Sequence, residues 1–215
     1  MLALFSTFVM LLVAPADELV DAGTGPQPAP IPVSWELEFT FEEPRRIEME
    51  IAGQREVYWY LVYTATNAGE RSQRFFPIAQ LVTEDLRVVD TDSGIHPFVF
   101  DAIRERHRLT HKYLVSPRDA IGDLRVGSSH ARESVFVWRH ADVNINQLTI
   151  YVAGLSGETL VVRNPLFQMG QPDSAANSRN FTLRKTLEIR YTLPGSNAGR
   201  LEADPQRLRT RWVMR

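Results

Sequence analysis

The chain has 215 residues, of which 44% are hydrophobic and 23% charged, so its composition is that of a globular protein with one or two domains rather than of a disordered chain. It contains no cysteine, which excludes disulfides, thiolate metal sites, iron–sulfur clusters, cysteine nucleophiles and a lipidated-cysteine anchor. The formal net charge of −2 provides no domain-wide basic excess, and we therefore expect no nucleic-acid partner.

The N-terminus resembles a secretory signal. Residues 2–14 form an uncharged apolar run, followed by Ala14-Pro15-Ala16. This pattern predicts a signal peptide over residues 1–16, with Ala22 as the alternative cleavage site. The run has no preceding Lys or Arg, which a start codon assigned too late or a buried amphipathic segment would also explain. We expect an exported protein, periplasmic or extracellular, without a transmembrane segment after cleavage, because a span needs about 20 apolar residues.

A proline-rich linker over residues 17–32 follows, since GTGPQPAPIP at 23–32 favours an extended spacer. From residue 33 the apolar residues recur with period two, as Trp35, Leu37, Phe39 and Phe41 do, which is typical of half-buried strands. The next clear run, residues 57–63, is apolar on both faces and predicts a central strand covered on each side. Further strands are expected at 47–51, 75–83, 86–90, 134–139, 147–153, 159–163, 181–193 and 207–214.

Residues 98–109 are the one helical candidate, with an apolar stripe of Phe98, Ala102, Ile103 and Leu109. Residues 164–180 read as a long loop. Together these elements predict one domain over residues 33–215: an all-β, antiparallel, immunoglobulin-like β-sandwich with one short crossover helix.

Four aromatic residues of the central strand raise the question of a carbohydrate site. Tyr58, Trp59, Tyr60 and Tyr63 would form a stacking platform for sugar rings if a strand face were exposed, whereas their apolar neighbours favour a place in the core. Strand glutamates are the matching candidates for paired catalytic carboxylates, and their alternation with apolar residues favours solvated strand faces instead. These glutamates are Glu36, Glu38, Glu42, Glu43, Glu48 and Glu50.

His107 and His111 have the i, i+4 spacing of helical metal ligands. Arg108 stands where a zinc protease has glutamate, and surrounding cations are expected to repel a metal, so we interpret the pair as a solvated helix face. Those cations are Arg104, Arg106, Arg108 and Lys112.

Three other motifs are incomplete. Asp142, Asn144 and Asn146 begin like a calcium loop but lack its glycine and closing glutamate, and Asp90 and Asp92 have no further ligand in register. Both are interpreted as turns. Residues 154–157, GLSG, lack the spacing and the following helix of a nucleophile elbow. We therefore expect no catalytic site, metal or cofactor.

The C-terminal RLRTRWVMR predicts a strand with Leu208, Thr210, Trp212 and Met214 facing inward. An outward cationic row would then either protect the sheet edge or contact an acidic partner or anionic surface polymer. That row is Arg207, Arg209, Arg211 and Arg215.

The segments VYWYLVYTATN, FVWRHADVNINQLTIYVAGLSGE and LRKTLEIRYTLPG, with a terminal Trp, resemble a group of uncharacterised exported bacterial proteins with an immunoglobulin-like sandwich domain. The resemblance spans residues 35–215 and implies export and a β fold, but no activity. We expect a non-enzymatic envelope module, a binding or structural part whose partner is an envelope protein or an anionic surface polymer. The alternative is a carbohydrate-active or carbohydrate-binding domain that uses the strand aromatics and glutamates.

Overall fold

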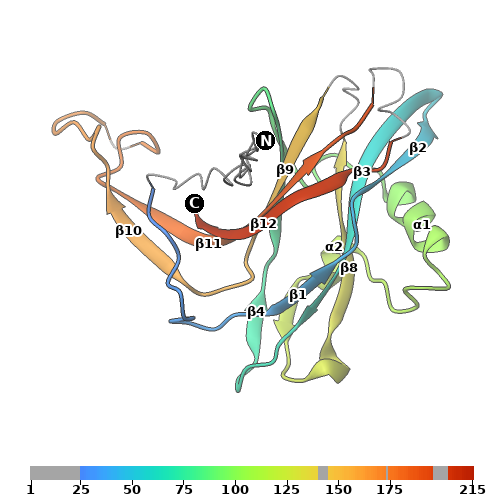
Figure 1. The fold of residues 1–215 in the computed structure, drawn as a ribbon, viewed down its shortest axis with the longest axis horizontal. Coiled ribbons are helices and arrows are strands. Elements are labelled where there is room, and N and C mark those ends of the chain that lie inside the picture. Colours follow the sequence, from blue (N-terminus) through green and yellow to red (C-terminus); the bar gives the residue numbers. More distant parts are fainter. Residues whose placement is uncertain (1–24, 140–144, 173, 196–202) are drawn as a thin grey trace, which may run out of the picture.

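The computed structural model describes residues 25–139, 145–172, 174–195 and 203–215. The predicted signal peptide, the linker up to residue 24, Asp142 and Asn144 lie outside the described residues. The described part is mostly antiparallel β-sheet with two short α-helices (Figure 1), so the all-β prediction is confirmed. None of the described helices is long and apolar enough to cross a membrane.

The first sheet is built around β3 (Gln54–Thr66), the long strand expected to be central. Strands β1 (Glu38–Phe41) and β2 (Arg45–Ile51) pair antiparallel with the two ends of β3, and β8 (Arg132–Arg139) pairs along most of its length. Alternate residues of β3 therefore point to opposite faces of this sheet, and both faces are covered.

The second sheet has the order β10-β11-β9-β5-β6, and β12 pairs with β11. Its strands agree with the predicted runs to within a few residues, because each run alternates or is rich in β-branched residues. The strands are β5 (Ile78–Thr83), β6 (Val88–Asp90), β9 (Gln147–Ala153), β10 (Thr159–Arg163), β11 (Asn180–Thr192) and β12 (Gln206–Met214). Small elements not expected from the sequence are β4 (Gln73–Phe75), β7 (Gly122–Leu124), α2 (Pro117–Ala120) and a 3-10 turn, Ser128–His130.

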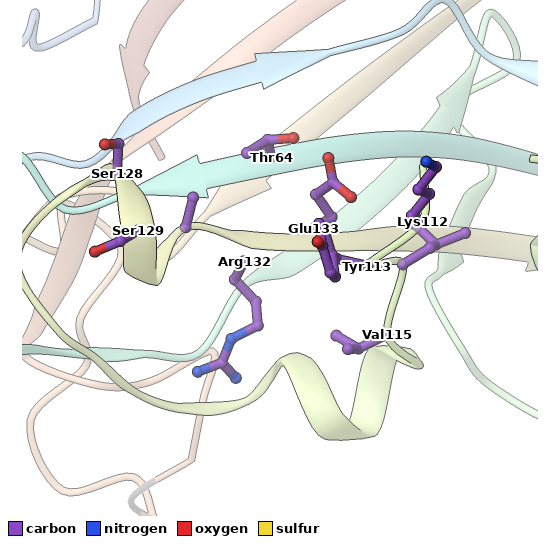
Figure 2. Close-up of a pocket in the computed structure, with 10 residues that line it drawn as sticks. Thr64, Lys112, Tyr113, Val115, Ser128, Ser129, Arg132 and Glu133 are labelled. Atoms are coloured by element: carbon purple, nitrogen blue, oxygen red, sulfur yellow. The ribbon is translucent and has the colours of Figure 1, made fainter. Parts of the chain in front are cut away.

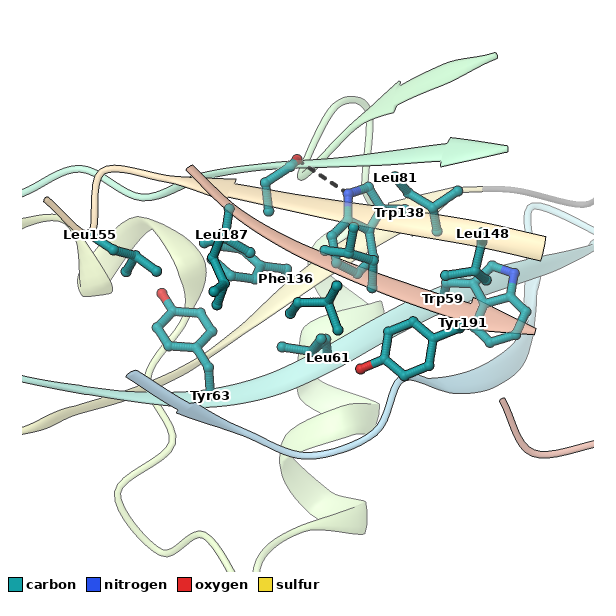
Figure 3. Packing of buried hydrophobic residues seen from close by; sticks show 14 of the residues in the cluster. Trp59, Leu61, Tyr63, Leu81, Phe136, Trp138, Leu148, Leu155, Leu187 and Tyr191 are labelled. Carbon is teal, nitrogen blue, oxygen red and sulfur yellow. Dashed lines mark hydrogen bonds between the residues drawn. The ribbon is translucent and has the colours of Figure 1, made fainter. Parts of the chain in front are cut away.

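The main core lies between the two sheets (Figure 3). Trp59, Phe136 and Trp138 of the first sheet pack against Ile150 and the other buried apolar residues of the second. The buried Trp138 Nε1 donates a hydrogen bond, 3.3 Å long, to the carbonyl oxygen of Ala79 across the sandwich. That bond satisfies the indole N–H and ties the sheets together.

Helix α1 (Pro97–Arg106) covers the outer face of the first sheet (Figure 1). Its buried residues are Val99 and Ile103, one turn apart, whereas Phe98 is 63% and Leu109 75% exposed. The predicted apolar stripe was therefore wrong at both ends. Leu109 lies beyond the last helical residue, and the true i, i+4 face is one position further along than Phe98.

Candidate functional site

The four aromatic residues of β3 are core residues. Trp59 and Tyr63 face the second sheet, Tyr58 and Tyr60 face α1, and each is only 1–2% exposed. Burial is the main reason that the pKa of Tyr58 rises to about 12, and its hydrogen bond to Glu56 adds to the shift. The core interpretation is thus confirmed, and these rings present no open face for stacking on a sugar.

The C-terminal arginines do not form one row. In the pairing of β12 with β11, Arg209 lies opposite Arg190 and Arg207 opposite Tyr191, so Leu208 is an extra residue. In a regular strand Arg207 and Arg209 would lie on the same face of the sheet. The extra residue of the β-bulge places them on opposite faces. The bulge leaves Leu208 55% exposed, contrary to the inward position expected for it, and turns Arg207 to the core side, where it pairs with Glu43 at 3.0 Å.

Over β11 and β12, the outer face of the second sheet carries five arginines and, among the described residues, one side-chain carboxylate, Glu188. Arg209 Nη2 and Arg211 Nε lie 2.9 and 3.2 Å from Glu188 Oε1. Burial alone would raise the pKa of Glu188, which is 3% exposed, but these two hydrogen bonds outweigh burial and lower it. The five are Arg184, Arg190, Arg209, Arg211 and Arg215, here called the arginine face.

On the opposite face of β11, Lys185 is 4% exposed and forms a second charged cluster. Its Nζ lies 2.6 Å from Glu36 Oε2 and 3.4 Å from Glu158 Oε2, and 5.0 Å from the centre of the Trp212 ring. Burial alone would lower the pKa of Lys185, but the two carboxylates more than offset it and raise the pKa. Glu36 therefore neutralises a buried cation rather than acting as a free acid.

A third cluster lies where the end of α1 meets the first sheet. Glu42 follows β1, His107 caps the C-terminus of α1, and His111 comes one turn later. The Nε2 of His111 is 2.9 Å and the Nδ1 of His107 4.0 Å from the two oxygens of the Glu42 carboxylate. The His107 side chain is only 4% exposed, so the solvated-face interpretation was wrong for it.

The other ring nitrogen of each histidine also has a neighbour. His107 Nε2 lies 3.2 Å from the hydroxyl of Tyr60, and His111 Nδ1 lies 3.6 Å from Glu133 Oε1 on β8. Burial lowers the pKa of His107 and favours its neutral form. Burial alone would raise the pKa of Glu42, but the hydrogen bond with His111 and the charge of Arg45 outweigh it and lower the pKa.

Of the four cations expected to repel a metal, two pair with acidic side chains, and one, Arg106, contacts the Tyr60 hydroxyl beside His107. Arg104 pairs with Asp101 at 2.9 Å on the surface of α1, and Arg108, two residues beyond the helix, pairs with Glu105 at 2.8 Å. Arg106 donates to the Tyr60 hydroxyl and to the carbonyl oxygen of Arg46.

A surface pocket of about 770 Å³ adjoins this third cluster. Figure 2 shows the residues that line the pocket. Glu133, which faces His111 Nδ1, is one of its walls, and Lys112 and Arg132 are others. The pocket thus adjoins the histidine cluster through one shared carboxylate.

The remaining sequence candidates that the structure describes do not converge on a cleft. Asp90 accepts a hydrogen bond from Gln80 on the neighbouring strand, and Asp92 lies in an exposed turn. Asn146 donates to Glu84, and Glu48 pairs with Arg55 at the surface. Residues 154–157 begin in a left-handed glycine turn and are followed by a strand, not a helix.

Sequence reasoning found the two histidines but missed their carboxylate partners. Glu42 is 69 residues from His111 in the sequence, and nothing in its surroundings distinguishes it from its neighbour Glu43. Only the packing of α1 on the first sheet brings these groups together.

No family model, no curated protein and no solved structure matches this chain.

Proposed function

We propose that the protein is a non-enzymatic, exported, immunoglobulin-like module of the cell envelope that binds an anionic surface polymer through its arginine face. The observation that carries the proposal is the excess of positive charge on that face. Among the described residues of β11 and β12, it has five arginines and one side-chain carboxylate, Glu188. Export rests on the signal-like N-terminus.

The arrangement of the arginine face suits an extended, multiply charged ligand. Arg209 and Arg211 are held by Glu188, so part of their conformational entropy is already lost before binding. Arg184 and Arg215 are exposed, and Arg190 is partly exposed. Guanidinium groups bind carboxylates and phosphates through two parallel hydrogen bonds, which gives planar recognition that an ammonium group does not.

The residues on which the alternative of a carbohydrate-active domain depends are largely buried or paired with other side chains. Its aromatic platform is buried, and four of its six strand glutamates pair with basic side chains. These four are Glu36, Glu42, Glu43 and Glu48. The outer faces of the two sheets carry no matching pair of carboxylates next to an exposed aromatic ring among the residues named for that activity.

The test compares binding to a carboxylated polysaccharide, alginate, with binding to neutral dextran. We expect the wild-type protein to bind alginate with an affinity that falls as salt rises, because exposed charges are screened. The variant R184S/R190S/R215S removes three charges but leaves the pairs of Glu188 with Arg209 and Arg211 intact, and should lose most of this binding.

The matched control, R55S/R104S/R108S, removes three arginines that pair elsewhere with acidic side chains. Equal losses in the two variants would mean that only net charge matters and would overturn the proposal. Capture of an acidic envelope protein by the arginine face, with no alginate binding, would replace the polymer by a protein partner.

A further inference from the structure

We propose that Glu42, His107 and His111 form a binding site for a divalent transition-metal ion of the zinc type. This inference is independent of the arginine face and goes beyond the proposed function. The two histidines supply imidazole nitrogens and Glu42 a carboxylate oxygen, which is a donor set found in zinc proteins.

The distances between the donor atoms fit an ion after small side-chain rotations. One ligand atom from each of the three residues lies within 4.8 Å of the other two. A tetrahedral ion with bonds of about 2.1 Å places its ligand atoms about 3.4 Å apart. The pair His111 Nε2 and Glu42 Oε1 is closer than this, at 2.9 Å, and His107 Nδ1 to Glu42 Oε2 is wider, at 4.0 Å.

The orientation of the rings is the strongest argument for a metal. Each histidine turns one nitrogen toward Glu42 and the other toward a polar group. His107 Nε2 lies 3.2 Å from the Tyr60 hydroxyl, and His111 Nδ1 lies 3.6 Å from Glu133 Oε1, just beyond hydrogen-bond distance. Metal-binding histidines almost always have such a partner on the far nitrogen, which fixes the tautomer and the ring plane. The sequence spacing of i, i+4 alone does not require either partner.

A buried carboxylate oxygen and the helix dipole also favour a cation at this place. Glu42 Oε2 is a buried atom without a hydrogen-bond partner in the described part of the chain, with only the ion pair to Arg45 at 3.3 Å beside it. Unsatisfied buried polar atoms are rare and call for an explanation such as an ion. The site also lies at the C-terminal end of α1, where the helix dipole favours a positive charge.

The donor set favours zinc over calcium or magnesium. Ca²⁺ and Mg²⁺ take oxygen ligands, whereas two imidazoles and one carboxylate suit Zn²⁺ and neighbouring transition ions. Three protein ligands leave a fourth position for water, and the Glu42 side chain, 34% exposed, keeps the site reachable from solvent. Arg45, 3.3 Å from Glu42 Oε2 and 52% exposed, must swing away when the ion enters.

The test is a titration of the purified, chelator-treated protein with Zn²⁺, followed by calorimetry and by thermal melting. We expect saturable binding of one ion per chain and a higher Tm. Changing Glu42→Gln or His111→Gln should abolish both effects. Glu133→Gln should weaken Zn²⁺ binding by about 10- to 100-fold, as losses of positioning groups do.

Glu42 is partly exposed, so E42Q should fold, and circular dichroism with a urea midpoint will verify that it does. The matched control is H96Q/H130Q, which removes two histidines outside the cluster. With Co²⁺ in place of Zn²⁺, strong visible absorption reports a tetrahedral site directly. No one-to-one binding in the wild type, equal binding in E42Q, or loss of binding in H96Q/H130Q would each overturn the proposal.

Discussion

Two clusters of carboxylates lie within this sandwich, and they differ in what balances their charge. Glu36 and Glu158 share the buried ammonium group of Lys185, which lies within 3.4 Å of both. Glu42 and Glu133 flank His111, and Glu42 also pairs with the exposed guanidinium of Arg45.

The difference separates a structural cluster from a candidate site. A buried ion is tolerated when its partner is built into the chain, because burying an uncompensated charge costs several kcal/mol. Lys185 fulfils this role permanently and leaves no place for a ligand. In the histidine cluster the donors converge, and Glu42 pairs with only the exposed Arg45 and with histidines, which is the electrostatic argument for the proposed ion.

The largest expected effect is on the Lys185 cluster. Replacing Lys185 by Met keeps the volume but leaves two carboxylates, one of them 8% exposed, without their cation. We expect the free energy of unfolding at pH 7 to fall by about 3 kcal/mol, the lower end of the range for breaking a buried pair, because Glu36 is partly solvated. Urea denaturation measures the change.

The chain contains its own control, since Lys112 is the only other lysine and is exposed. K112M should change the free energy of unfolding by less than about 0.5 kcal/mol. If both variants were equally stable, the charge of Lys185 would not be needed to balance Glu36 and Glu158.

The next effect concerns Glu188, where the signs are reversed and a buried anion is held by two arginines. E188Q should lower the free energy of unfolding at pH 7 by about 2 kcal/mol, because hydrogen bonds to charged groups are worth about 1.5–3 kcal/mol. The pKa of Glu188 is lowered from 4.5 in the folded protein, so its contribution is present above that value and is lost as pH falls through the folded pKa.

Urea titrations of wild type and E188Q between pH 7 and pH 3 test this sign. The two stabilities should converge as the solution becomes more acidic. A difference that grew toward low pH would show that Glu188 is not stabilised as its carboxylate.

A smaller effect comes from removing one acid in each cluster without metal present. E158Q weakens the pair with Lys185 and the hydrogen bond that Ala29 N donates to Glu158 Oε1, so we expect a loss of about 1 kcal/mol. E133Q removes a carboxylate whose Oε2 makes no hydrogen bond within the described residues, and should change stability by less than about 0.5 kcal/mol. Parallel urea curves in a chelating buffer compare the two, and an equal loss would mean that both clusters are structural.

Much of the fold could be predicted from the sequence, because buried strands carry their period in the residues themselves. Strand β9 was predicted at its observed bounds, and the doubly apolar run 57–63 marked the central strand β3. Strands of three residues such as β4 contain too few residues to show a period. The bulge at Leu208 has no signature in composition, since either register places alternating apolar and basic residues on β12.

The candidate site was predictable only in part. The spacing of His107 and His111 was visible, but a neighbouring run of arginines suggested repulsion of a metal. That prediction remains untested. Arg104 and Arg108 pair with acidic residues three positions away in the sequence, whereas Arg106 contacts Tyr60, the neighbour of His107. Side-chain direction on a short helix is set by tertiary packing, which one sequence does not reveal.

The smallest expected effect on stability is at Arg45, and the same variant tests whether this arginine and the proposed ion compete for Glu42. Its pair with Glu42 is exposed, and such pairs contribute about 0–1 kcal/mol, so R45Q should leave the urea midpoint nearly unchanged. Arg45 nevertheless partly balances the charge of Glu42, as Lys185 balances the carboxylates of the other cluster. Removing it should therefore strengthen Zn²⁺ binding severalfold, measured by calorimetry beside R55Q, whose ion pair with Glu48 lies elsewhere on the first sheet. Unchanged or weaker binding in R45Q would mean that Arg45 and the ion do not compete for Glu42.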